Sequence, residues 1–145
     1  MNAVASEGTL TLRLPNRLSI IGETADDIAD FLRGRGVAER AVQHLLLSLD
    51  EAMTNTIAYA WPSGGAHELM LVLKVSEGLV VAVVSDDGIA FDPLEVPPPD
   101  LESSLEDRPV GGLGVHFMLT LMDEVTYRRE GDRNVLTMRK SYAAE

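Results

Sequence analysis

The chain has 145 residues, of which 46% are hydrophobic and 24% are charged, so it can bury a substantial core. Its 12 basic and 23 acidic residues give a net charge of −11, which disfavours binding to nucleic acid or to anionic lipid. It contains no cysteine, and this excludes disulfide bonds and thiolate chemistry.

The sequence gives no sign of a targeting or membrane segment. No apolar run reaches the roughly 18 residues of a membrane span, and the N-terminus lacks the basic start and apolar block of a signal peptide. The three histidines are dispersed and have none of the usual metal-ligand spacings. We therefore expect a single domain over residues 1–145, located in the cytoplasm, with no membrane contact and no direct contact with nucleic acid.

Two elements are predicted in the first quarter of the chain. Residues 9–14 alternate polar and apolar side chains, which is typical of a half-buried strand. From Leu18 apolar residues recur every three or four positions, which predicts an amphipathic helix up to the Gly34-Arg35-Gly36 stop. The start of this helix is open, because Thr24 with Asp27 would make an acceptable capping box inside it.

A long helix is predicted from about Ala38 to Ala60. Its apolar face is formed by Val42, Leu45, Leu46, Leu49, Met53, Ile57 and Ala60. Glu51 and Asn55 are four residues apart and fall about 40° from each other on the side turned away from that face. They are neighbours that can serve one site, and the alternative is an ordinary solvated helix face.

Two strands follow, from Leu69 to Val75 and from Leu79 to Val84, with a turn at Glu77-Gly78. The second is apolar without alternation, as expected of a central strand that is covered or paired on both sides. It ends at Asp86, which is followed by Asp87-Gly88. A carboxylate in this position often lies at the mouth of a cleft, and the alternative is a plain Asp-Asp-Gly turn.

The last third of the chain contains a long connection and a hairpin. Residues 94–108 are rich in proline and carboxylates and are too long for a simple connection, which is typical of a lid or a disordered insert. The glycines of residues 111–114 open an apolar helix that is predicted to end near Met122. Their free N–H groups suit a phosphate, although glycine also serves tight helix packing. Residues 124–129 and 134–140 predict a closing antiparallel hairpin.

These elements predict an α+β fold, a two-layer sandwich in which a mostly antiparallel sheet is covered on one face by three helices.

Three segments together resemble the nucleotide-binding boxes of the Bergerat-fold (GHKL, HATPase) ATPases. Glu51-Ala52-Met53-Thr54-Asn55 resembles the first box, residues 86–93 resemble the second, and Gly112-Leu113-Gly114 resembles the third. The small size, Phe91-Asp92-Pro93 and residues 121–125 are similar to the anti-sigma factor serine/threonine kinase branch of that superfamily. The resemblance covers nearly the whole chain and implies ATP and Mg²⁺ as cofactors.

The resemblance also implies a role for each matching residue. Asn55 would hold Mg²⁺ through its amide oxygen, and Glu51 would be the general base. Asp86 would accept a hydrogen bond from the adenine amino group, and the expected nucleotide-binding residues further include Gly88, Ala90, Gly112, Leu113 and Gly114.

Three further positions qualify this interpretation. Ala90 stands where the family usually has glycine, which would stiffen the hinge of a lid expected at about residues 94–111. Tyr59 stands where many relatives carry histidine. Arg108 is the cation of the expected lid and would contact the γ-phosphate or remain solvated.

The implied function is that of a protein serine/threonine kinase that is also an anti-sigma factor. In this branch the kinase phosphorylates a small antagonist with a STAS fold and sequesters a sigma factor in a partner-switching cycle, commonly as a homodimer. The alternative from another functional class is a non-catalytic module that binds ATP only as a conformational ligand and sequesters a regulatory protein.

Overall fold

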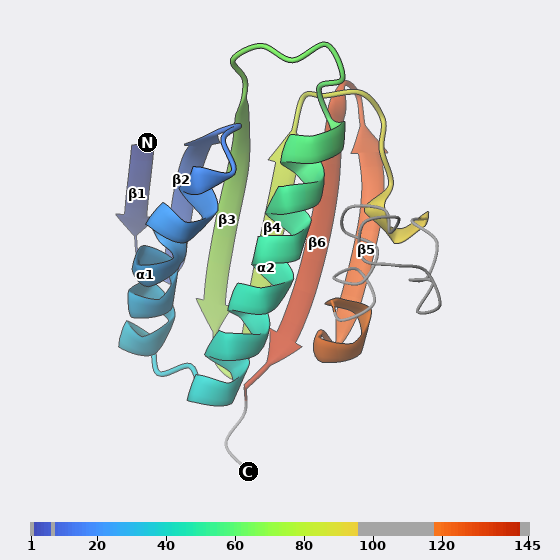
Figure 1. Cartoon of the computed structure of the whole chain (residues 1–145). Coiled ribbons are helices and arrows are strands. Elements are labelled where there is room, and N and C mark those ends of the chain that lie inside the picture. The colour runs from blue at the N-terminus through green and yellow to red at the C-terminus, as the bar shows by residue number, and fades with distance from the viewer. Residues whose placement is uncertain (1, 7, 96–117, 143–145) are drawn as a thin grey trace, which may run out of the picture.

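The computed structural model describes residues 2–6, 8–95 and 118–142, and Figure 1 shows how they are arranged. Six strands form one antiparallel sheet in the order β1-β2-β3-β4-β6-β5. The strands are β1 (Asn2–Ser6), β2 (Thr9–Pro15), β3 (Glu68–Ser76), β4 (Leu79–Asp86), β5 (Glu124–Glu130) and β6 (Arg133–Ser141).

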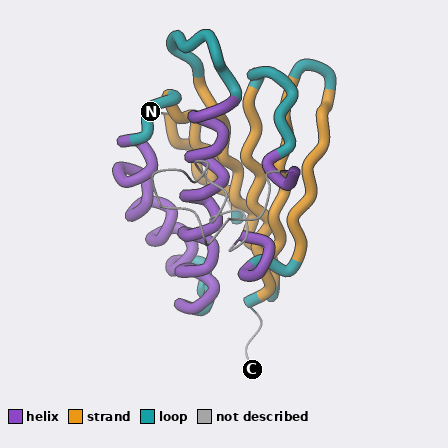
Figure 2. Tube along the Cα trace, turned by 45° about the vertical axis from the view of Figure 1, so that its right-hand side comes forward, coloured by secondary structure: helices purple, strands orange, loops and turns teal. Residues whose placement is uncertain are grey.

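Helices cover one face of this sheet. They are α1 (Ser19–Gly34), α2 (Glu39–Tyr59), the short 3-10 helix η1 (Pro93–Glu95) and a helical turn at residues 118–121. Figure 2 shows α1 and α2 together on one side of the strands, and no described helix lies on the other side. The predicted α+β two-layer sandwich is therefore confirmed.

The core lies between the sheet and the helices, because side chains alternate between the two faces of each strand. In β4 every second residue is fully buried against the helices, and the residues between them are only partly buried. The strand is paired on both edges, as predicted, but only one of its faces is covered. The largest fully buried side chains include Leu12, Leu14, Ile28, Leu32, Leu45, Leu49, Met53, Leu71, Leu73 and Met138.

The first helix begins earlier than the capping box suggests. α1 starts at Ser19, and Thr24 lies inside it, where its hydroxyl donates to the Ile20 carbonyl at 2.8 Å. Thr24 is completely buried, so a back-bond within the helix replaces the predicted cap. Leu18 also differs from the prediction, because it precedes the helix and is 61% exposed.

Two further differences concern strand and loop assignments. β1 was not predicted, because it is only five residues long and most of these residues are small. The segment becomes a strand by pairing with β2. The expected unpacked connection from Leu94 onwards instead begins within η1, and Leu94 packs against the core. No helix in the described part of the chain combines the length and apolarity that a membrane span requires.

Candidate functional site

Glu51 and Asn55 lie in the C-terminal half of α2, on a polar row along the helix. Asn55 is only 1% exposed, and neither Nδ2 nor Oδ1 has a hydrogen-bond partner in the described structure. Glu51 Oε2 and the hydroxyl of Ser48 are likewise buried without a partner. The alternative of a solvated helix face is therefore wrong. The polar atoms of this row are buried away from water and form no hydrogen bond in the described structure.

The environment of Glu51 makes its carboxyl group a weaker acid than an ordinary glutamate. Burial raises the pKa of Glu51 to about 7, and the charge of Asp50 adds to this shift. The Asn55 amide acts in the opposite direction, although its Nδ2 does not reach hydrogen-bond geometry. A group with this pKa can take up or release a proton near neutral pH.

Asp86 lies at the end of β4 and points into the layer beneath the helices. It is 4% exposed, and its Oδ1 accepts hydrogen bonds from the Gly88 N–H at 2.8 Å and from Asn134 Nδ2 at 2.9 Å. Burial raises the pKa of Asp86, and these two bonds oppose that shift. Asp86 therefore closes the Asp-Asp-Gly turn and is also part of a buried polar cluster.

Gly88 is required at its position because the loop after β4 passes directly over the end of α2. The Ile89 N–H donates to the Ala60 carbonyl at 2.8 Å. A Cβ atom on Gly88 would lie 2.3 Å from that same carbonyl oxygen, which is closer than atoms can approach. This contact fixes the second predicted box against the helix that carries the first.

Asn134 is a central site residue that the sequence reasoning missed. It is 5% exposed and lies in β6 directly opposite Asp86. Its Oδ1 accepts from Tyr127 Oη at 2.6 Å and from Arg129 Nη1 at 3.2 Å. A signal was present, because Asn134 is in phase with the inward-facing Leu136 and a polar residue on the core face of a strand is unusual.

Some of these groups line one small cavity of about 20 Å³ between the end of α2 and the sheet. Asn55, Asp86 and Asn134 contribute polar atoms, and Phe91 lies on the same cavity and stacks on Tyr59 with ring centroids 4.9 Å apart. A cavity of this size holds about one water molecule. The structure thus brings Asn55 of the first predicted box and Asp86 of the second to one cavity.

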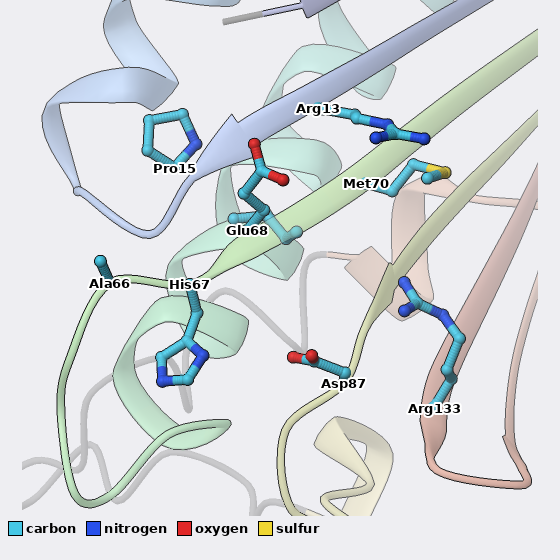
Figure 3. A pocket seen from close by; sticks show the side chains of 9 residues that line it. Arg13, Pro15, Ala66, His67, Glu68, Met70, Asp87 and Arg133 are labelled. Carbon is cyan, nitrogen blue, oxygen red and sulfur yellow. The ribbon is translucent and has the colours of Figure 1, made fainter.

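A wider cavity of about 570 Å³ lies on the other, uncovered face of the sheet. Figure 3 shows Arg13, Glu68, Asp87 and Arg133, from four neighbouring strand ends, around this space. Its lining has mixed charge and contains none of the predicted site residues. Asp87 Oδ1 accepts a hydrogen bond from Trp61 Nε1 at 3.1 Å. The cavity with the greater volume is therefore not the one that contains the predicted site residues.

The remaining predicted site residues are not seen at the small cavity beside Asn55 and Asp86. Gly112, Leu113, Gly114 and Arg108 lie outside the described residues. Ala90 is described and is exposed in the loop between Gly88 and η1. The third box and the lid therefore stay predictions.

Residues 14–140 match the family described as the histidine kinase-like ATPase domain. The chain belongs to this family. A histidine kinase-like ATPase domain implies that the chain uses ATP.

Relatives of this ATPase domain include proteins named as kinases. The chain is 30% identical over 132 residues to the serine/threonine-protein kinase BtrW of Bordetella bronchiseptica, covering 88% of this chain and 93% of that protein. It is 29% identical over 133 residues to the serine-protein kinase RsbW of Listeria monocytogenes, covering 88% and 85%. The Acinetobacter baumannii histidine kinase AdeS has a similar fold, with a TM-score of 0.52 and 15% identity over 92% of this chain and 68% of that one.

Proposed function

We propose that this histidine kinase-like ATPase domain is a protein serine/threonine kinase that transfers phosphate from ATP with Mg²⁺ and also acts as an anti-sigma factor. The main observation in support is the buried, unpartnered Asn55 amide beside Glu51, on the same cavity as Asp86. The names of the relatives in Bordetella and Listeria support phosphoryl transfer to serine or threonine.

The residues of this cavity fit the proposed cofactors. Asn55 Oδ1 is a buried hard oxygen without a bond, which is the type of ligand that Mg²⁺ takes from proteins. Bound Mg²⁺ would neutralise charge on the phosphates during transfer. Asp86 would orient the adenine by accepting a hydrogen bond from its amino group, with Gly88 and Ala90 passing close to the base.

Glu51 is proposed to hold the proton that leaves the attacking hydroxyl group of the substrate. Its pKa of about 7 means that it is partly ionised at neutral pH and binds a proton readily. Asn55 lies one helical turn away, so the same rigid segment of α2 positions the base and the proposed metal ligand.

The third box and the lid complete the proposal. Gly112, Leu113 and Gly114 would donate backbone N–H groups to the phosphates, as a glycine-rich helix start does. Residues 94–111 would close over the nucleotide, and Arg108 would contact the γ-phosphate or stay in solvent. The substrate would be a STAS-type antagonist and the second partner a sigma factor, in the cytoplasm.

A homodimer through the uncovered face of the sheet is also part of this proposal. The centre of that face carries the partly buried valines Val72, Val81 and Val83, and no described element packs on them. Arg128 and Arg139 are each paired with a glutamate there, so their charges are partly neutralised. A second copy would cover the valines, and Val83→Glu should then lower the sedimentation coefficient to that of a monomer.

Isothermal titration with ATP and Mg²⁺ tests the nucleotide site. The unmodified protein should bind, Asn55→Ala should lose the Mg²⁺-dependent part of the affinity, and Asp86→Asn should weaken binding with or without Mg²⁺. Absence of binding by the unmodified protein would contradict the proposal. If the unmodified protein binds ATP but transfers no phosphate to a partner, the non-catalytic ATP-gated module becomes the better description.

A further inference from the structure

The amide of Asn134 has one fixed orientation. Nδ2 donates both of its hydrogens, to Asp86 Oδ1 at 2.9 Å and to the Ile89 carbonyl at 2.7 Å. Oδ1 accepts from the Phe91 N–H at 3.2 Å, in addition to Tyr127 and Arg129. A flipped amide would place its oxygen against the Asp86 carboxylate and its NH₂ against three donors, so the network excludes the flip.

This orientation determines what Asp86 offers to a ligand. Oδ1 already accepts two hydrogen bonds, from Asn134 and from the Gly88 N–H, and both favour the ionised carboxylate. The bonds to these two donors leave Oδ2 as the oxygen that can accept a bond from a ligand in the cavity. An ionised carboxylate can only accept, whereas a protonated one can also donate.

We infer that Asn134 determines base specificity by keeping Asp86 as a hydrogen-bond acceptor, so that the cavity selects purines with a 6-amino group over 6-oxo purines. This inference rests on the proposed nucleotide site. Asn134 acts through Asp86 and is a positioning residue. A 6-oxo group would set a carbonyl oxygen against the carboxylate oxygen at the place where adenine has a donor, and two facing acceptors disfavour binding.

The surroundings of Asp86 explain why a positioning residue is needed. Burial raises the pKa of this carboxyl group, and the charge of Asp87 adds to the shift. Asn134 and Gly88 provide the opposing bonds, and Arg133 contributes a smaller opposing charge. Loss of the Asn134 donor would move Asp86 towards the protonated form, which can donate to a 6-oxo group.

A matched pair of variants tests the inference. The side chains introduced by Asn134→Thr and Asn134→Val have nearly the same shape, but only threonine provides a hydrogen-bond donor, its hydroxyl, opposite Asp86. The affinities of ATP and inosine triphosphate, which carries a 6-oxo group, would be measured by titration calorimetry at one pH. Their ratio is the readout, because a merely structural defect lowers both affinities together.

The unmodified protein and Asn134→Thr should prefer ATP, and in Asn134→Val the preference should fall about tenfold or more, as expected for one hydrogen bond to a charged group. An equal preference in Thr and Val, or no preference in the unmodified protein, would overturn the inference. If the unmodified protein binds neither nucleotide, the proposed function itself fails.

A second variant covers the case in which Asn134→Val does not fold. Tyr127→Phe removes the 2.6 Å bond that orients the Asn134 oxygen and leaves Asn134 in place. The ATP preference should fall by about two- to fivefold, because two other donors still hold that oxygen. An unchanged preference in this variant would also contradict the inference.

Discussion

The cavity has two polar walls that differ in their hydrogen bonding. On the α2 wall, Asn55 lines the cavity and its amide has no partner in the described structure, and Glu51 and Ser48 on the same side of the helix also carry buried atoms without partners. On the strand wall, Asp86 and Asn134 are joined to each other and to the surrounding loop and strands. Both walls belong to the same site, but only the strand wall is complete without a ligand.

The two walls therefore affect the stability of the ligand-free protein in different ways. An unpartnered buried polar group costs about 1–3 kcal/mol, so the α2 wall destabilises the ligand-free protein. The strand wall offsets its own desolvation through its bonds and so contributes a rigid surface. In the proposed site, the polar atoms of the α2 wall would form their bonds with ligand atoms. The strand wall would be preorganised to bind one type of base.

The largest expected effect is on phosphoryl transfer and concerns the α2 wall. Glu51→Gln keeps the shape of the side chain and removes the proton acceptor, so transfer to a serine-containing substrate should fall about 100-fold or more. Radiolabelled phosphate incorporation measures this, with ATP affinity as the control, which should change by less than about threefold. Full transfer by the variant would mean that another group accepts the proton.

The next prediction compares the two walls directly through stability. Asn134→Ala breaks five hydrogen bonds and leaves Asp86 short of a donor, so the free energy of unfolding should fall by about 3 kcal/mol. Asn55→Ala removes an amide that has no partner, so the free energy of unfolding should stay the same or rise by up to about 1 kcal/mol. Urea unfolding of nucleotide-free, metal-free protein measures both, and equal losses would remove the distinction between the walls.

A third prediction concerns how the two walls are joined. Gly88→Ala would push a methyl group into the Ala60 carbonyl, and the free energy of unfolding should fall by about 2 kcal/mol. Gly22→Ala is the matched control, because a Cβ atom there meets nothing within 4 Å and lies in α1. That variant should be about 0.5–1 kcal/mol more stable. Thermal unfolding of both proteins measures the contrast, and a stable Gly88→Ala would show that the walls can separate easily.

The smallest expected effect is the pH dependence that Glu51 imposes on stability. Its pKa rises from 4.5 in the unfolded chain to about 7 in the folded one, so folding favours the protonated form. The stability contributed by this proton is complete below pH 4.5 and is lost as the pH rises to about 7. Glu51→Gln cannot ionise, so it should equal the unmodified protein at pH 4 and exceed it by about 1–2 kcal/mol at pH 8, discounted for partial exposure.

Urea unfolding at several pH values, in the absence of Mg²⁺ and nucleotide, would detect this crossover. Asp50→Asn is a suitable control, because it removes a charge that adds only the smaller part of the shift. A constant difference between Glu51→Gln and the unmodified protein at all pH values would indicate a packing effect.

Much of the fold was predictable because it depends on local periodicity. The alternation in residues 9–14 and the three- and four-residue spacing in residues 38–60 report directly which side of an element is buried. β1 escaped prediction because its pairing with β2, rather than its own composition, makes it a strand. The position of Thr24 escaped because a capping sequence can also be accommodated inside a helix by a bond to the preceding turn.

The sequence pointed to individual residues of the cavity but not to their arrangement. The sequence alone showed that the segments carrying Glu51, Asn55 and Asp86 resemble nucleotide-binding boxes, since a box is a short local pattern. Only the tertiary structure decided that Asn55 is buried without a partner and that Asn134, 48 residues from Asp86 in the chain, fixes that carboxylate. Burial and hydrogen-bond partners depend on which distant segments meet across the sheet, and this is decided by the packing of the whole chain.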